Sequence, residues 1–306
     1  MLRYGLRRLG QSVPTLVAVS VLTFAMVRLI PGDPAVLIAG EEATPETLRG
    51  IREQLALDRP LAEQYLVYAG RLLQGDLGTS IRSKQPVAGE LAARIPATVE
   101  LALAALLVLV VVGTLLGVAA AVWRDRWPDH LVRVLSLVGV STPTFWLGAV
   151  LILLFAIRFR LFPVSGRGAL VYLVLPAVTA SMDGVALVAR LVRASLLDVL
   201  AEDYVRTGRA KGLGEGPVVW RHALRNALIP VVTVLGLELG RLLGGVVVVE
   251  SVFGWPGFGR LLVTAIQTRD YPLVQSAILV FGAAVILLNL AIDLSLGLLD
   301  PRVRYR

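Results

Sequence analysis

Long apolar runs separated by short polar segments dominate this chain. Six runs are each about 20 residues long, the length of helix that crosses the roughly 30 Å hydrocarbon core of a bilayer. The pattern predicts an all-α integral membrane protein with six transmembrane helices. The runs lie at about 9–30, 98–122, 131–157, 170–192, 227–249 and 276–298.

Basic residues set the expected orientation of these helices. Arg3, Arg7 and Arg8 precede the first run, whose apolar part of about 22 residues is longer than a typical signal-peptide core, so we expect an uncleaved anchor. Arginine and lysine concentrate in the segments on the same side as the N-terminus, above all in 124–133 and 190–225. By the positive-inside rule this bias puts both termini in the cytoplasm of a multi-pass plasma membrane protein.

Composition narrows the function further. Hydrophobic residues make up 56% of the chain and the mean hydropathy is +0.76, which excludes an ordinary soluble domain. The net charge of +8 lies at membrane-flanking positions, where we expect contact with membrane lipid and no nucleic acid. There is no cysteine and there are two histidines, so we expect no disulfide, no metal site and no cofactor.

A polar insert of about 65 residues, 31–96, separates the first two runs. Its opening Pro and Gly residues at 31–34 predict a turn. Thr44 is a candidate N-cap for a helix over 45–57, and the apolar spacing in 60–74 predicts a second amphipathic helix. A packed cap over the membrane helices and direct substrate handling are both open for this extracytoplasmic helical insert.

The segment 201–230 is strongly polar although it lies between two apolar runs, so it must face water. It resembles the cytoplasmic "EAA" coupling loop of ABC importer permeases, in the variant of the dipeptide, oligopeptide and nickel branch. Arg206, Gly208 and Arg225 depart from the general pattern, and the first and last departures are also typical of that branch. The resemblance is carried by Arg206-Thr207-Gly208, Gly212, His222-Ala223-Leu224-Arg225-Asn226-Ala227 and Pro230.

Further motifs extend the resemblance over nearly the whole chain. Their order and spacing are more specific than any single Gly- or Pro-rich motif. They are Gly75-Asp76-Leu77-Gly78-Thr79-Ser80, Arg94-Ile95-Pro96-Ala97-Thr98 with Glu100-Leu101, Pro143-Thr144-Phe145-Trp146, Phe253-Gly254-Trp255-Pro256-Gly257-Phe258-Gly259 and Asp270-Tyr271-Pro272.

The resemblance implies a division into an anchor span (1–30), the insert (31–96) and a permease core (97–306) of five spans, with the coupling loop at about 196–226. It also implies a second homologous permease subunit, two ATPase subunits and an extracytoplasmic substrate-binding protein as partners, in a bacterial or archaeal plasma membrane. The chain has no phosphate-binding G-x-x-x-x-G-K-[ST] loop, so it is expected to be a transport subunit with no catalytic residue.

We expect the coupling contact to be a short helix over 200–210. Leu200, Tyr204 and Gly208 would share one face for insertion into a groove of the ATPase, with charged residues around the rim. Gly212 and Gly214 can take left-handed backbone angles and turn the chain. The residues expected to couple to the ATPase are Leu200, Asp203, Tyr204, Arg206, Gly208, Arg209, Lys211 and Gly212.

Charged residues inside the apolar runs are candidates for the translocation path, because each is costly at the centre of a membrane. Asp183, Glu238, Arg241 and Asp293 qualify. Glu238 and Arg241 lie three apart on one helix and can pair. We expect Asp183, Glu238 and Arg241 to line the translocation path, where Glu238 and Arg241 either meet the termini of a peptide or form a self-neutralised pair at a buried helix interface.

Gly236, Gly240, Gly244 and Gly245 give the fifth run a small-residue face that permits close helix packing, within the chain or with a second permease. An ion-coupled secondary transporter is the main alternative to an ATP-driven peptide importer, but the sequence shows no clear repeat or ion relay. An intramembrane enzyme lacks the expected motifs. The cargo stays open among dipeptides, oligopeptides, glutathione, nickel chelates and sugars.

Overall fold

The computed structural model describes residues 2–29, 35–36, 43–54 and 57–299. Over these residues the regular structure is helical, apart from one isolated bridge between Thr79 and Pro86. The expectation of an all-α fold is therefore confirmed. The chain divides into two compact units: a discontinuous unit of Met1–Pro96 with Gly257–Arg306, and a central unit of Ala97–Pro256.

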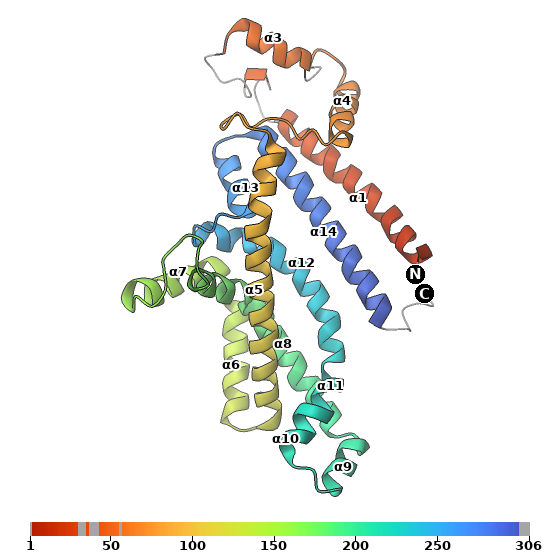
Figure 1. Ribbon diagram of the computed structural model, residues 1–306, viewed down its shortest axis with the longest axis vertical. Helices are drawn as coiled ribbons and strands as arrows, with labels where there is room; N and C mark the ends of the chain where they lie inside the picture. The colour runs from red at the N-terminus through yellow and green to blue at the C-terminus, as the bar shows by residue number, and fades with distance from the viewer. Residues whose placement is uncertain (1, 30–34, 37–42, 55–56, 300–306) are drawn as a thin grey trace. The chain divides into compact units, whose positions relative to one another are not determined.

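The discontinuous unit pairs the two ends of the chain. Helix α1 lies along α14 (Figure 1). The two helices are close at Gly282 of α14, where an added Cβ would lie 3.4 Å from Cγ1 of Val19 on α1. At the next residue of α1, the hydroxyls of Ser20 and Tyr65 are 2.8 Å apart. The helices of this unit are α1 (Leu2–Leu29), α3 (Pro45–Gln54), α4 (Leu61–Leu73), the first part of α5 (Val87–Val122), α13 (Phe258–Gln267) and α14 (Tyr271–Leu299).

The helices expected in the insert are present. The Thr44 hydroxyl accepts the amide of Thr47 at 3.3 Å, so Thr44 caps α3 as predicted. Helix α3 is described as far as Gln54, and residue 57 is no longer helical; residues 55–56 and the turn expected at 31–34 lie outside the described residues. Helix α4 packs its aromatic face on α1, with the ring centroids of Phe24 and Tyr65 5.4 Å apart, which favours a packed role for this part.

The central unit is built around α5, α8 and α12. Leu109 of α5, Val188 of α8 and Val246 of α12 are fully buried, because each helix turns an apolar face to the other two. Its helices are the rest of α5, α6 (Trp127–Ser141), α7 (Thr144–Leu151), η1 (Ile152–Arg158), α8 (Val171–Leu200), α9 (Asp203–Ala210), α10 (Glu215–Pro217), η2 (Val218–Ala223), α11 (Leu224–Ala227) and α12 (Ile229–Val252).

Glycines on α5 allow that close approach. A Cβ on Gly113 would lie 2.9 Å from the Cβ of Val188, and one on Gly117 would lie 2.6 Å from the Cβ of Val192 and 2.7 Å from a backbone oxygen of α8. These distances are too short for any side chain. Gly113 and Gly117 therefore form a small-residue stripe that brings α5 and α8 together, which the sequence analysis did not single out.

Four helices in the described residues are long and apolar enough to cross a membrane: Val87–Val122, Val171–Leu200, Ile229–Val252 and Tyr271–Ile292. The third expected span, 131–157, is not one straight helix. It breaks at Thr142 and Pro143, and the pair Trp127–Ser141 and Thr144–Arg158 is bent by 110°. Proline lacks an amide hydrogen and disfavours helical angles in the residue before it, which explains the break. The bent pair makes a fifth candidate, while the apolar part of α1, Gly10–Met26, is shorter.

Candidate functional site

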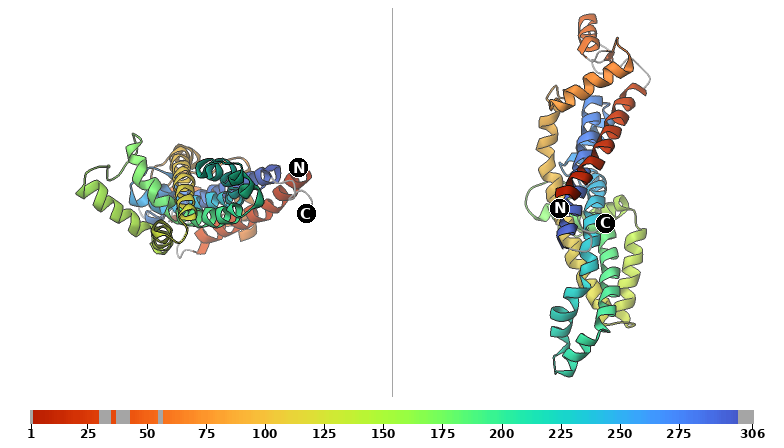
Figure 2. Two further views of the ribbon diagram at one scale, coloured as in Figure 1. Left: turned by 90° about the horizontal axis from the view of Figure 1, so that it is seen from below. Right: turned by 90° about the vertical axis from the view of Figure 1, so that its right-hand side faces the viewer.

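Helix α9 is a short exposed helix at one end of the central unit, where the chain passes from α8 to α12 (Figures 1 and 2). Val205 is the buried residue of this helix, with 1% of its surface exposed. Tyr204 is 44% exposed, and its hydroxyl accepts a hydrogen bond from the side-chain amide of Asn226 at 2.8 Å. One apolar anchor and one polar contact therefore hold α9 while most of its surface stays available to a partner.

The charged rim of α9 projects into solvent. The side chain of Asp203 is 98% exposed and that of Arg206 is 74% exposed, with their charged atoms 3.6 Å apart. Lys211 is also exposed and ends the helix. A pair this exposed contributes little to stability. Its charges are available for recognition of another surface.

A second ion pair closes the turn after α9. Arg209 Nε and Nη2 donate to the two carboxylate oxygens of Glu215 at 2.8 and 3.1 Å. The guanidinium of Arg209 holds the pKa of the Glu215 carboxyl below its ordinary value, because the hydrogen bonds favour the charged form. Between them Gly212 has φ of +84°, the left-handed turn that was expected.

Two details of the expected coupling segment are corrected. Gly214 has φ of −67° and ψ of 158°, so it is extended and the reversal depends on Gly212. Leu200 is the last residue of α8 and packs against the central core, because Ala201 and Glu202 interrupt the helix before α9 begins at Asp203. Leu200 therefore does not share a helix face with Tyr204 and Gly208. Gly208 lies beside Leu213, whose Cδ1 would be 3.4 Å from an added Cβ.

The charged residues expected in the translocation path come together between α8 and α12. Arg241 Nη1 donates to Glu238 Oε1 at 2.8 Å; the Glu238 side chain is 6% exposed and that of Arg241 is 64% exposed. Asp183, on α8, interacts electrostatically with both. The Glu238 carboxylate also lies against Gly184, where a Cβ would be 3.3 Å from its Oε2. The side chain of Asp293 lies outside what is described.

The glycines of α12 differ from one another in their surroundings. Gly236 and Gly240 are partly buried, whereas Gly244 and Gly245 are exposed, and a Cβ on either of these two would meet nothing within 4 Å. Gly244 therefore presents a small-residue surface that nothing in the described part of the chain covers.

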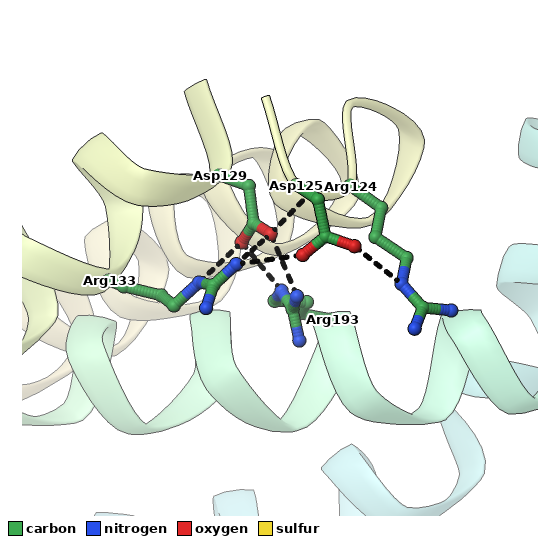
Figure 3. Close-up of polar contacts among 5 residues, drawn as sticks. All are labelled: Arg124, Asp125, Asp129, Arg133 and Arg193. Atoms are coloured by element: carbon green, nitrogen blue, oxygen red, sulfur yellow. Dashed lines mark hydrogen bonds and ion pairs between the residues drawn. The ribbon is translucent and has the colours of Figure 1, made fainter. Parts of the chain in front are cut away.

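The structure reveals a charge cluster that the sequence analysis missed (Figure 3). Asp129, in the first turn of α6, is fully buried and accepts from Arg193 of α8 at 2.7 and 2.8 Å. Arg133 donates to the same two oxygens at 3.1 and 2.5 Å, and the backbone amide of Asp125 donates at 3.0 Å. The spacing of Asp129 and Arg133 was visible in the sequence, but Arg193 lies 64 residues away.

Motifs near residues 97–100 and 253–255 meet in the central unit. The indole Nε1 of Trp255, which is 1% exposed, donates to the Ala97 carbonyl at 2.8 Å. Thr98 donates to the buried carboxylate of Glu250 at 2.5 Å, and Arg167 binds Glu100 with two hydrogen bonds of 2.8 and 2.5 Å. These contacts therefore tie the part of α5 around residue 98 to the C-terminal end of α12 and to the loops that contain Trp255 and Arg167.

The motifs at 75–80 and 270–272 meet in the discontinuous unit. The buried carboxylate of Asp270 accepts from the Ser80 hydroxyl at 2.5 Å and from the amides of Ile81 and Arg82 at 3.2 and 3.4 Å. It also accepts the amide of Leu273, at 3.4 Å, in the first turn of α14. One carboxylate thus caps a helix and holds a loop. Across the described residues, no group of His, Cys, Asp and Glu side chains could hold a metal ion.

Comparison with known proteins covers the chain from end to end. Residues 113–305 match the family described as binding-protein-dependent transport system inner membrane component, and residues 1–102 match the model of its N-terminal part. The chain is 47% identical over 306 residues to the glutathione transport system permease protein GsiC of Escherichia coli O6:H1. It is 46% identical over 306 residues to the proteins of that name from Salmonella typhimurium and Escherichia coli K12. Each alignment spans 100% of both sequences.

Proposed function

We propose a function for this chain from its family, since it belongs to the inner membrane components of binding-protein-dependent transport systems, which are the permease subunits of ABC importers. The chain forms part of the translocation path of an ATP-driven importer of short peptides. The observation that carries the proposal is α9, a helix exposed on almost all sides, with one buried residue and one side-chain hydrogen bond to hold it. The chain is a membrane transport subunit, and ATP hydrolysis belongs to separate subunits of the complex.

The proposed topology has six spans with both termini in the cytoplasm. The four long helices, the bent pair of α6 and α7 with η1, and α1 supply them. The insert 31–96 lies outside and is followed by the permease core over 97–306, whose helix α9 lies inside. The excess of basic residues around α9 supports this arrangement.

We propose that α9 docks in a groove of an ATPase subunit. Tyr204 and Gly208 give the helix a face with one large side chain and one small one, and Asp203, Arg206, Arg209 and Lys211 surround it with charge. Leu200 acts from the end of α8 by supporting α9. The complex contains two ATPase subunits, a second homologous permease and an extracytoplasmic binding protein, and Gly236, Gly240 and Gly244 face that second permease.

We propose that Asp183, Glu238 and Arg241 line the path and meet the ends of the cargo. The set carries both signs of charge, and the exposed guanidinium of Arg241 donates to Glu238 through one nitrogen, which leaves its other donors for a carboxylate. The relatives carry the name of glutathione transport, and glutathione is a peptide with both amino and carboxylate groups. Glutathione is therefore the first cargo to test.

The test uses the tagged chain co-expressed with its partner subunits. Gly212→Pro should abolish recovery of the ATPases, because proline cannot adopt φ of +84°. Gly214→Pro is the matched control, since φ of −67° suits proline, and the ATPases should still co-purify. Mass spectrometry reads out the recovered subunits. Loss of the ATPases from both variants, or from neither, would contradict the assignment of α9.

A second experiment distinguishes the energy source and cargo. Vesicles that contain the complete complex should import labelled glutathione only with ATP, and collapse of the proton gradient with ATP maintained should leave uptake unchanged. Arg241→Gln should reduce uptake while the ATPases remain bound. Uptake that follows the proton gradient would favour an ion-coupled carrier, which the family relationship does not support.

A further inference from the structure

The contact between α6 and α8 combines a small apolar cluster with one buried charge cluster. Val132 of α6 and Ala189 of α8 form a small apolar cluster there together with Ala120 of α5. Dispersion contacts between side chains this small are individually weak and do not fix an orientation. The Asp129 carboxylate adds directional contacts, because the guanidinium groups of Arg133 and Arg193 each bind it through two hydrogen bonds in a fixed orientation.

The position of this cluster along α8 is informative. Helix α8 runs without interruption through Val171–Leu200 and carries Asp183 in its middle and Arg193 near its end. Helix α9 follows after a break of two residues, Ala201 and Glu202. A force applied to α9 therefore enters α8 at its C-terminal end and passes Arg193 before it reaches Asp183.

We propose that Asp129 is a positioning residue for coupling: by fixing Arg193, it makes the cytoplasmic ends of α6 and α8 move together with α9. Without it, displacement of α9 would slide α8 along α6 and less of the motion would reach the charged set at Asp183 and Glu238. The inference rests on the proposed function insofar as α9 receives the force from an ATPase. Arg133 braces the carboxylate from its own helix, and Arg193 carries the link to α8.

The test compares two similar substitutions in one cluster. Asp129→Asn removes the charge that binds Arg193. Asp125→Asn is the control, because the Asp125 side chain is 67% exposed and pairs with Arg124 and Arg133. Figure 3 marks no interaction between this side chain and Arg193. Asparagine also tolerates the positive φ of 57° at that position. Both variants are reconstituted in liposomes with the partner subunits, and glutathione imported per ATP hydrolysed is measured.

We expect the Asp129→Asn complex to hydrolyse ATP but to import about tenfold less glutathione per ATP, the upper range of effects for residues that carry coupling. Asp125→Asn should keep the wild-type ratio. An unchanged ratio in Asp129→Asn, or equal losses of hydrolysis and import, would overturn the proposal in favour of a purely structural role. Absence of glutathione import by the wild type would instead count against the proposed cargo.

A rescue experiment keeps the test decisive if Asp129→Asn assembles poorly. The chain contains no cysteine, so the pair Asp129→Cys and Arg193→Cys can be joined by a short bifunctional thiol reagent without removing other thiols. We expect the double variant to import little per ATP before cross-linking and to regain most of the wild-type ratio afterwards. A ratio that stays low in the cross-linked protein would show that joining α6 to α8 is not what Asp129 provides.

Discussion

Single glycines decide how closely the helices of the central unit approach. At Gly117 an added Cβ would lie 2.7 Å from a backbone oxygen of Ala189, which cannot move without shifting α8. At Gly244 an added Cβ would meet nothing within 4 Å. The same residue type on two helices therefore serves two purposes, a contact already made within the chain and a surface left open.

Gly117→Val should destabilise the folded protein by about 3 kcal/mol or more, because overpacking forces the helices apart. The measurement is thermal unfolding of the purified protein in detergent. Gly244→Val is the control on an exposed helix face and should lower the unfolding temperature little. Equal effects of the two changes would show that the close contact of α5 with α8 contributes nothing to stability.

Asp270 stabilises the discontinuous unit through its buried carboxylate. It accepts hydrogen bonds from Ser80, Ile81, Arg82 and Leu273. Asp270→Ala leaves these donors without their acceptor and should cost about 3 kcal/mol of unfolding free energy. Asp76→Ala is the comparison, because exposed Asp76 accepts one hydrogen bond, from the amide of Gly78 at 2.9 Å. Unfolding by denaturant should separate the two variants.

At the scale of elements, the turn after α9 is set by a glycine and an ion pair. The lowered pKa of Glu215 means that its pairing with Arg209 stabilises the turn above the ordinary carboxyl pKa. The stabilisation is lost as the pH falls through the lowered pKa of the folded form. The turn should therefore be unaffected between neutral pH and about pH 5 and should loosen below about pH 4.

Hydrogen exchange of the segment 203–217, corrected for intrinsic exchange rates, measures this effect. Protection in the wild type should fall on acidification, whereas Glu215→Gln should have low protection at every pH because its amide cannot form the ion pair. If the acid-induced loss is as large in Glu215→Gln as in the wild type, another group is responsible.

The sequence predicted the helices that depend on long apolar runs. It did not predict features that depend on a single residue within a run or on contacts between distant residues. For each of α8, α12 and α14, at least one helix end lies within a few residues of the boundary expected from the sequence. The length of an apolar run can be read directly from the sequence, without knowledge of the fold. The bend at Pro143 was missed because that proline lies inside an apolar run. A proline in a membrane helix can be tolerated, so the residue alone did not predict a break.

The candidate sites show the same division. Glu238 and Arg241 were predicted to pair because they share a helix, and they do pair. Asp129 was missed because an acid in the first turn of a helix is common and its partner Arg193 lies on another helix. Leu200 was assigned to the wrong helix because no glycine or proline marks the break after it. Contacts between distant segments need the fold before they can be recognised.

For the whole molecule, the proposed topology predicts which side of the membrane each segment occupies. Because the chain has no cysteine, single cysteines introduced at exposed positions report this directly. Lys211→Cys, beside α9, should react with an impermeant maleimide only after the cells are opened. Leu73→Cys, at a position 90% exposed in the insert, should react in intact cells. The opposite pattern, or one pattern for both sites, would refute the six-span topology.

The discontinuity of one unit has a consequence for how the protein is made. The contacts of α9 join residues 6 and 22 positions apart, so they can form soon after the ribosome has released that stretch. Ser80 must wait for Asp270, 190 residues later in synthesis. Until the C-terminal part has been made, the loop after α4 lacks its acceptor and α1 can pack on α4 but not yet on α14. The newly made N-terminal third is therefore the part that the insertion machinery has to protect for longest.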